Sequence, residues 1–267
     1  MDLVYIVKQG EKNEDLRYSL RSVSKFVPHD KIWIVGYKPS WVINTEYIPV
    51  AQDKGSKWKN SVNNILTACN CEEISDNFVL MNDDFFAIKP IENLEESINL
   101  SLGLLEEIVI NQKKKKRNSN WSKAFIYIDD LLKSLDIEEP YYNYESHTPL
   151  LINKKEYLEV MSLPKVIDFM KTNKVLHKRT LYKNIYKVDS KILSLDVKLS
   201  SIKDDTNKRI NICDWLSVYD NQVGNYKFKN LNDLLHNLFP ESCEYEKPKT
   251  IKSKPMYKFK WSKFRQY

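Results

Sequence analysis

Two adjacent acids, Asp83 and Asp84, follow directly after an apolar run in the first half of the chain. The run, residues 78–81, is typical of a strand buried inside an α/β fold, because such strands are nearly continuous in hydrophobic residues. Ligands in these folds collect beyond the carboxyl ends of the strands, where both acids would lie. Two carboxylates there could hold a divalent cation that in turn grips a diphosphate. The alternative is a turn between two strands, with Asn82 and Asp83 present only for turn geometry.

Basic and amide side chains at helical spacing could complete such a site. Arg17 and Arg21 lie four residues apart in a predicted helix, from which they could reach a phosphate near the strand ends. Their spacing alone favours the simpler interpretation of solvated helix arginines. Lys57, Asn60 and Asn64 fall near one another on a second predicted helix, again at three- and four-residue spacing.

The elements that must position these residues follow from hydrophobic periodicity and from helix start and stop signals. The predicted order is strand 3–7, helix 14–26 ended by Pro28, strand 32–35, strand 47–50, helix 57–69, strand 78–81, helix 94–110, helix 121–135, helices 154–161 and 165–175, and strand 193–197. The first three elements form a βαβ unit, which favours a parallel sheet with a right-handed crossover. The sequence therefore predicts an α/β fold.

Two common nucleotide-binding motifs are missing from the sequence. No G-x-G-x-x-G follows the first predicted strand, and no G-x-x-x-x-G-K-[ST] occurs anywhere in a chain with only 5 glycines. Both motifs need glycines where the backbone closely approaches phosphates. A dinucleotide-binding fold and a P-loop NTPase are therefore disfavoured.

The composition is that of a globular protein with a substantial core. The 267 residues are 42% hydrophobic and 12% aromatic, which fits one large domain or two small ones. No apolar run approaches the roughly 20 residues needed to cross a bilayer, and the N-terminus lacks the pattern of a secretory signal. The 4 cysteines are too few and too irregular for a disulfide framework. We therefore expect a protein of the reducing cytoplasm.

Positive charge is concentrated at the C-terminus. The formal net charge is +6, but residues 247–267 carry eight Lys or Arg and no acid, interleaved with aromatic residues. Such a segment could bind a polyanion such as DNA, or an anionic membrane, and it could equally be a solvated arm that packs on the body. A second basic run, from Lys113 to Arg117, is most simply a solvated loop, with a role in holding an anionic acceptor as the alternative.

Several separated blocks resemble known families. Residues 2–5, 13–23, 32–36, 39–42 and 78–86 resemble the Stealth-type sugar-phosphate transferases and a group of short phage-encoded glycosyltransferases. Residues 145–149, 178–184 and 196–198 are similar to the phage group alone. One departure is residues 7–10, Val-Lys-Gln-Gly, which stand where the Stealth block usually has Trp-Val-Asp-Gly. The chain therefore lacks the aspartate of that Stealth block, which disfavours a Stealth-type transfer of sugar phosphate.

The resemblance implies a GT-A-like domain over residues 1–200, with a mixed, mostly parallel sheet flanked by helices. A mainly helical extension over residues 201–246 and the basic aromatic tail 247–267 would follow it. The resemblance also implies a nucleotide-diphosphate sugar as donor, bound through Mn²⁺ or Mg²⁺.

The implied roles can be transferred one residue at a time. Asp83 and Asp84 would bind the metal and the diphosphate, and Asn82 would set the turn before them. Arg17 and Arg21 would lie near the donor phosphates. His147, Arg179 and Asp84 would lie at the reaction centre. A histidine takes either protonation state near neutral pH, so His147 is a candidate base for an acceptor hydroxyl, with a structural role as the alternative.

The sequence is compatible with three functions. The first is a metal-dependent glycosyltransferase whose acceptor is a modified base in phage DNA, a surface polysaccharide or a protein. The second is a Stealth-like transferase of sugar-1-phosphate acting on a polysaccharide. The third is a non-catalytic protein that binds a polyanion through its basic tail.

Overall fold

The computed structural model describes residues 1–10, 12–53, 56–187, 190–199, 211–219, 223, 225 and 229–248. The strands are β1 (Asp2–Val7), β2 (Ile32–Gly36), β3 (Glu46–Pro49), β4 (Asn77–Asn82), β5 (Phe85–Ala87), β6 (Leu100–Ser101), β7 (Leu150–Asn153), β8 (Lys191–Ile192), β9 (Lys198–Leu199) and β10 (Trp215–Val218). The helices are α1 (Glu14–Phe26), α2 (Lys57–Cys69), α3 (Leu94–Ile98), α4 (Leu105–Lys114), α5 (Asn120–Ser134), α6 (Lys154–Ser162), α7 (Pro164–Lys171), α8 (Lys178–Ile185) and α10 (Lys229–Leu238).

The predicted βαβ unit is present as β1, α1 and β2. Helix α1 begins after Asn13, has two acids in its first turn and ends where Val27 becomes extended before Pro28. Acids near a helix N-terminus are favoured by the helix dipole, and the residue before a proline is restricted to extended conformations. The buried side chains of α1 include Leu16, Leu20 and Val23, at the three- and four-residue spacing of one helix face.

The main sheet has five strands in the order β3-β2-β1-β4-β7. Strands β3, β2, β1 and β4 are parallel, and only β7 runs antiparallel at the edge, beside β4. The register pairs Ile6 of β1 with both Val35 of β2 and Asn82 of β4. The carboxyl ends of these three strands therefore lie side by side at one edge of the sheet.

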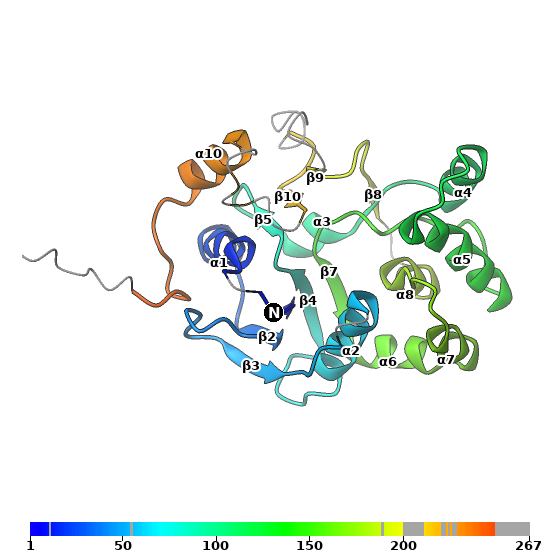
Figure 1. Cartoon of the computed structure of the whole chain (residues 1–267), viewed down its shortest axis with the longest axis horizontal. Coiled ribbons are helices and arrows are strands. Elements are labelled where there is room, and N and C mark those ends of the chain that lie inside the picture. The colour runs from blue at the N-terminus through cyan, green and yellow to red at the C-terminus, as the bar shows by residue number, and fades with distance from the viewer. Residues whose placement is uncertain are drawn as a thin grey trace, which may run out of the picture.

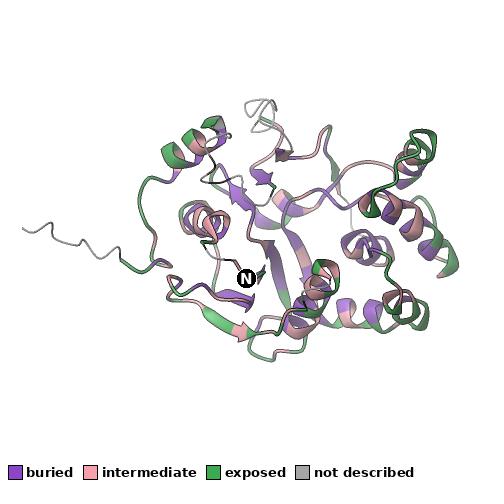
Figure 2. Ribbon diagram, in the orientation of Figure 1, coloured by how far each residue is buried: buried purple, intermediate pink, exposed green. Residues whose placement is uncertain are grey.

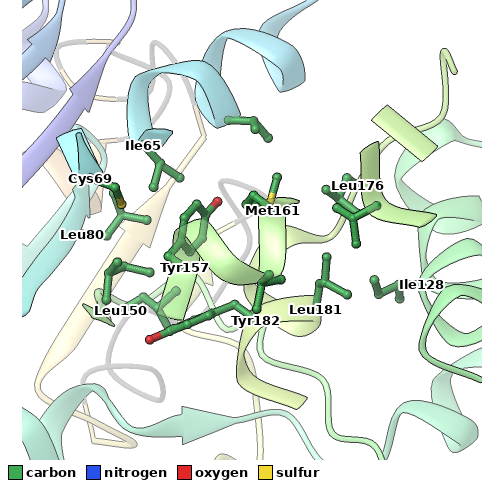
Figure 3. Close-up of a cluster of buried hydrophobic side chains, with 14 of the residues drawn as sticks. Ile65, Cys69, Leu80, Ile128, Leu150, Tyr157, Met161, Leu176, Leu181 and Tyr182 are labelled. Carbon is green, nitrogen blue, oxygen red and sulfur yellow. The ribbon is translucent and has the colours of Figure 1, made fainter. Parts of the chain in front are cut away.

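Each face of the main sheet is covered by its own set of helices (Figure 1). Leu3, Tyr5 and Val7 of β1 share a cluster with α1 and α3 on one face. Val4, between them in sequence, points into the other cluster, with α2, α5, α6 and α8. Alternation of this kind is the two-residue period of a strand. Figure 3 shows part of the second cluster, where Tyr157 and Met161 of α6 lie among side chains of the sheet and of neighbouring helices.

Two smaller sheets flank the main one. A three-stranded sheet has the order β5-β10-β9, with β5 and β10 antiparallel and β10 and β9 parallel. Strands β6 and β8 form a parallel pair. The resulting mixed α/β architecture, with a mainly parallel central sheet between helices, is the predicted fold class, and most residues of its interior strands are buried (Figure 2).

Several elements differ from the sequence-based predictions. The helix predicted over residues 94–110 is broken into α3, β6 and α4, because Asn99 leaves the helical conformation and Gly103 has φ +85°. The polar stretch 178–184 is the helix α8, which was missed. The strand predicted at 193–197 is displaced to β8 and β9 on either side. The segment expected to be mainly helical, residues 201–246, contributes β10 as well as α10.

No helix within the described ranges is both long enough and apolar enough to span a membrane.

The conformation and surroundings of Gly36, at the end of β2, allow a testable prediction about the stability of the fold. Its φ is +108°, and a Cβ there would lie 2.5 Å from Val7 O and 2.7 Å from Asn64 Nδ2. We expect Gly36→Ala to lower the free energy of unfolding by about 2–4 kcal/mol, because backbone strain and a backbone clash add together. Urea denaturation measures the change.

Gly103→Ala is the matched control, because Gly103 also has positive φ (+85°) but nothing lies within 4 Å of the position that a Cβ would take there. It should lose only the roughly 1–2 kcal/mol that a left-handed conformation costs an L-residue. Equal losses in the two variants would show that the close approach at Gly36 is unimportant.

Candidate functional site

A cleft of about 540 Å³ opens at the carboxyl edge of the parallel strands. Its floor comes from the ends of β1 and β4, where Ile6, Leu80 and Asn82 line it. The walls come from α2, from the start of α5, from the loop before β7, from the start of α8 and from β9. Ligand sites in open α/β sheets collect at this edge, and the volume is within the usual range for small-molecule pockets.

Asp83 and Asp84 form the turn between β4 and β5 and both line the cleft. Asp84 is buried, and its Oδ2 accepts hydrogen bonds from Lys198 Nζ at 3.2 Å and from Ser217 Oγ at 3.2 Å. Among the described residues these contacts involve only Oδ2, so Oδ1 could serve a ligand. Asp83 is half-buried. Strand β4 therefore delivers two carboxylates to the cleft, as its sequence predicts.

Positive charge predominates in this cleft. The cations among its described lining residues are Lys8, Lys57, Lys178, Arg179 and Lys198, against the acids Asp83, Asp84 and Glu145. Five cations and three carboxylates give a net charge of +2 with His147 neutral. A concave site with this balance attracts polyanionic groups such as diphosphates.

His147 lies at the side of the cleft in the loop before β7. Its Nδ1 is 2.7 Å from Asp196 Oδ2, and its ring is 6.0 Å from that of Trp121 at an interplanar angle of 33°. Trp121 in turn stacks on Trp58 of α2, at 5.5 Å and 28°. The backbone of His147 has φ 50°, a left-handed conformation that costs a non-glycine residue energy and that concentrates at functional sites.

A cluster of buried charged and polar residues lies next to this loop. Burial alone would raise the pKa of Glu145, but the charges of His177, Arg179 and Lys178 outweigh it, so the pKa of this carboxyl is lowered. Burial lowers the pKa of His177, which is 1% exposed. Arg179 Nη2 donates to the carbonyl oxygens of Thr148 and Pro149. Arg179 thus braces the backbone next to His147.

The predicted polar face of α2 lies on the opposite wall. Lys57, Asn60 and Asn64 all line the cleft. The Asn60 side chain is bonded in both directions to the backbone of Asp53, at 2.7 and 3.0 Å. Asn64 Nδ2 donates to Val35 O at 3.3 Å, while its buried Oδ1 has no partner among the described residues. Asn60 therefore braces a loop, and Asn64 keeps an acceptor at the cleft.

Arg17 and Arg21, expected near donor phosphates, do not line this cleft. Both pair with the buried carboxylate of Glu246, through Arg17 Nη1 at 2.5 Å and Arg21 Nε at 2.5 Å. The Arg17 guanidinium also lies 4.0 Å from the Trp41 ring centre, and Arg21 Nη1 donates to Phe239 O at 3.1 Å. The two arginines fix the segment after α10 to α1. Both arginines lie on the helix that the sequence predicts. Their spacing does not indicate, however, that their partner is an acid more than 220 residues away.

The other basic features lie elsewhere. Lys113 and Lys114 end α4, and all five residues from Lys113 to Arg117 are exposed and outside the cleft lining. Of the basic tail, only Lys247 and Pro248 belong to the described residues.

Eight of the ten residues singled out from the sequence line the cleft: Asn82, Asp83, Asp84, Lys57, Asn60, Asn64, His147 and Arg179. Sequence reasoning missed Lys198, Asp196, Trp121, Trp58 and Lys8 as parts of the site. Asp196 and Lys198 did stand in a block that resembles the phage group, and this was the one available signal.

No protein-family model matches the sequence, and no curated protein matches it. Among solved structures, the fold is similar to that of the galactosyltransferase LgtC in complex with donor and acceptor sugar analogues. The TM-score is 0.50 at 10% identity, over 91% of this chain and 98% of that chain. An active-site mutant of LgtC matches with a TM-score of 0.50 at 10% identity, over 89% and 96%. The glycosyltransferase GlyE of Streptococcus pneumoniae TIGR4 aligns with a TM-score of 0.38 at 10% identity, over 72% of this chain and 45% of that chain. The chain has a GT-A-like glycosyltransferase fold.

The Arg17–Arg21–Glu246 cluster makes a prediction that can be tested by denaturation. Burial raises the pKa of Glu246, hydrogen bonds from Arg21 and Arg17 lower it more, and the net pKa is lowered. A carboxyl with a lowered folded-state pKa adds stability above its unfolded pKa of about 4.3, and this is lost as pH falls further. Glu246→Gln should therefore cost about 3–5 kcal/mol at pH 7, because it leaves buried arginine charge without its partner.

The control is Asp168→Asn, which breaks an exposed pair with Lys171 and should change stability by less than about 1 kcal/mol. The gap between wild type and Glu246→Gln should narrow below about pH 4, as the wild-type carboxyl becomes protonated. A gap that is independent of pH would contradict the charged pairing.

Proposed function

We propose that the protein is a glycosyltransferase that takes a sugar from a nucleotide-diphosphate sugar and transfers it to an acceptor hydroxyl. The observation that carries this proposal is the pairing of Asp83 and Asp84 with an excess of lysines in one cleft at the carboxyl edge of the parallel strands. A donor of this kind has a diphosphate that must be held and a sugar that must be presented to an acceptor. The likeness of the fold to glycosyltransferases supports the same reaction class.

Asp83 and Asp84 fit a Mn²⁺ or Mg²⁺ ion that is shared with the donor. Three-residue groups of His, Cys, Asp or Glu suited to a metal do not occur among the described residues. Mg²⁺, however, is usually held by one or two carboxylates, with substrate phosphates and water as its remaining ligands. Asp84 Oδ1 and the half-buried Asp83 supply such a pair. When bound, the ion would neutralise charge that develops on the diphosphate.

Lysines of the cleft supply the remaining positive charge. Lys198 lies on Asp84, and Lys8 follows β1 at the level where Ile6 pairs with Asn82. Lys178 lies at the start of α8, next to Arg179. Fixed cations placed where charge accumulates on a leaving group lower the barrier without reorganising during the reaction. In our proposal these side chains hold the diphosphate while the bond to the sugar breaks.

The acceptor that the cleft suits best is the end of a carbohydrate. The volume of about 540 Å³ is that of a single small-molecule pocket, which suits a donor together with the end of an acceptor better than a large acceptor surface. LgtC was solved with an acceptor sugar analogue, which favours this choice. A hydroxylated base of phage DNA remains the second candidate, and it would have to be turned out of the duplex to enter. The basic run from Lys113 to Arg117 is exposed and could bind a DNA backbone.

The decisive test is product analysis with Mn²⁺ and a panel of nucleotide sugars. We expect nucleoside diphosphate as product, through transfer to water or to added oligosaccharides. Asp83→Asn and Asp84→Asn should each lower kcat at least about 10²-fold, the usual loss when transition-state charge is left unbalanced. Free Mn²⁺ measured by electron paramagnetic resonance should show weaker binding by both variants in the presence of donor.

Asp168→Asn is the control for charge removal, and circular dichroism establishes that each variant is folded. Asp84 contacts Lys198 and Ser217, so its replacement also removes structural contacts. Undiminished turnover in folded Asp83→Asn and Asp84→Asn would sink the proposal. Nucleoside monophosphate as product would instead indicate the Stealth-like transfer of sugar phosphate.

A further inference from the structure

We propose that Asp196 and His147 form a general-base dyad that deprotonates the acceptor hydroxyl, with Asp196 as the positioning residue. The inference rests on the proposed glycosyl transfer and assigns the base and the stereochemical course within that site. It begins from the 2.7 Å contact between His147 Nδ1 and Asp196 Oδ2. A carboxylate at Nδ1 holds the proton on that nitrogen and leaves Nε2 as the basic atom.

Three features fix the orientation of the His147 ring. Asp196 Oδ2 contacts one edge of the ring, the indole of Trp121 packs beside it with ring centres 6.0 Å apart at a tilt of 33°, and the backbone has φ 50°. Arg179 braces the next two carbonyl groups, those of Thr148 and Pro149. Among the described residues no hydrogen-bond partner is present for Nε2, and His147 lines the cleft with its side chain 22% exposed. A side chain held in this way is already positioned for proton transfer.

The other candidates for a base are less suitable. Glu145 lines the cleft, but it accepts hydrogen bonds from Thr180 and its pKa is lowered by its cationic neighbours, so it is a weak base. His177 is buried behind Trp121, with ring centres 4.3 Å apart, and does not line the cleft. Asp84 bonds to Lys198 and Ser217 through Oδ2, and in our proposal its Oδ1 serves the metal. His147 is the one group among these that combines access with a basic nitrogen.

One short segment connects the two halves of the site. Asp196 lies two residues before Lys198, the first residue of β9, and its Oδ1 accepts a hydrogen bond from the backbone N–H of Lys198 at 3.3 Å. Asp196 contacts His147, and Lys198 Nζ contacts Asp84 Oδ2. The same segment therefore positions the base on the acceptor side and a cation on the donor side.

The reaction balances with these groups alone. The acceptor oxygen forms a bond to the anomeric carbon while the bond from that carbon to the diphosphate oxygen breaks. The electron pair of the broken bond leaves on the diphosphate, and the hydroxyl proton passes to Nε2 of His147. Asp196 stabilises the imidazolium that results. A base that activates the acceptor on the face opposite the leaving group gives a single displacement, so the product has the inverted anomeric configuration.

The test uses the full chain, Mn²⁺ and a nucleotide-sugar panel with water as acceptor. His147→Gly removes the ring and leaves a residue that adopts φ 50° without strain. It should lower kcat about 10²–10⁴-fold, the usual contribution of general-base catalysis, with donor affinity within about twofold of wild type. Added imidazole should restore part of this activity. Asp196→Asn should lower kcat about 10²-fold without rescue by imidazole.

Nuclear magnetic resonance supplies readouts that a purely structural role would not change. The first anomer released should be the inverted one, and ¹⁵N spectra should place the His147 proton on Nδ1 in wild type. Asp168→Asn is the matched carboxylate control and should leave all of these unchanged.

The outcomes separate the dyad from the proposed function. Donor turnover that persists in His147→Gly or Asp196→Asn, absence of imidazole rescue, or a retained anomer would overturn the dyad while the glycosyltransferase proposal stands. A wild-type protein that neither binds nor consumes any donor would overturn the proposed function and, with it, the base role of His147.

Discussion

Parallel pairing of β1 with β2 and β4 is the constraint on which the site depends. Because the three strands run in the same direction and in register, Ile6, Val35 and Asn82 end at one level. Beyond that level β4 ends in the turn of Asp83 and Asp84, and both of these acids line the cleft. A parallel sheet buried on both faces has few other places where polar groups can gather. The lysines around the two acids come from the end of β1, from α2, from α8 and from β9.

The lysines and acids of the cleft also explain how a net charge of +2 is tolerated in a concave site. Each of the most buried charges has an opposite neighbour, as in Lys198 with Asp84 and Glu145 with Lys178 and Arg179. Removing one partner of such a pair costs far more than an exposed pair contributes. A polyanionic ligand would complete this arrangement, because it meets the positive excess that the protein's own acids leave.

The sequence predicted best what is decided locally. Helices α1 and α2 begin and end where predicted, since caps, proline and apolar periodicity agree there. The sequence also located the two acids at the end of β4. Sequence-based prediction failed where a structure depends on contacts between distant segments. Strand β10 pairs with β5, more than 120 residues away, and Arg21 pairs with Glu246. The contact of Asp196 with His147 is another contact between distant segments, and the spacing of the two residues along the chain does not predict it.

The attachment of the C-terminal segment has a practical consequence for experiments that shorten the chain. Glu246 holds both arginines of α1, and the backbone N–H of Lys247 donates to Trp41 O at 2.8 Å. A chain that stops at residue 248 keeps these contacts and removes most of the basic aromatic stretch. One that stops before Glu246 removes the carboxylate that pairs with Arg21 and leaves Arg17, among the described residues, with only its pair to Glu14. Loss of activity in the chain that stops before Glu246 would reflect misfolding. Only the chain that stops at residue 248 tests what the basic aromatic stretch itself contributes.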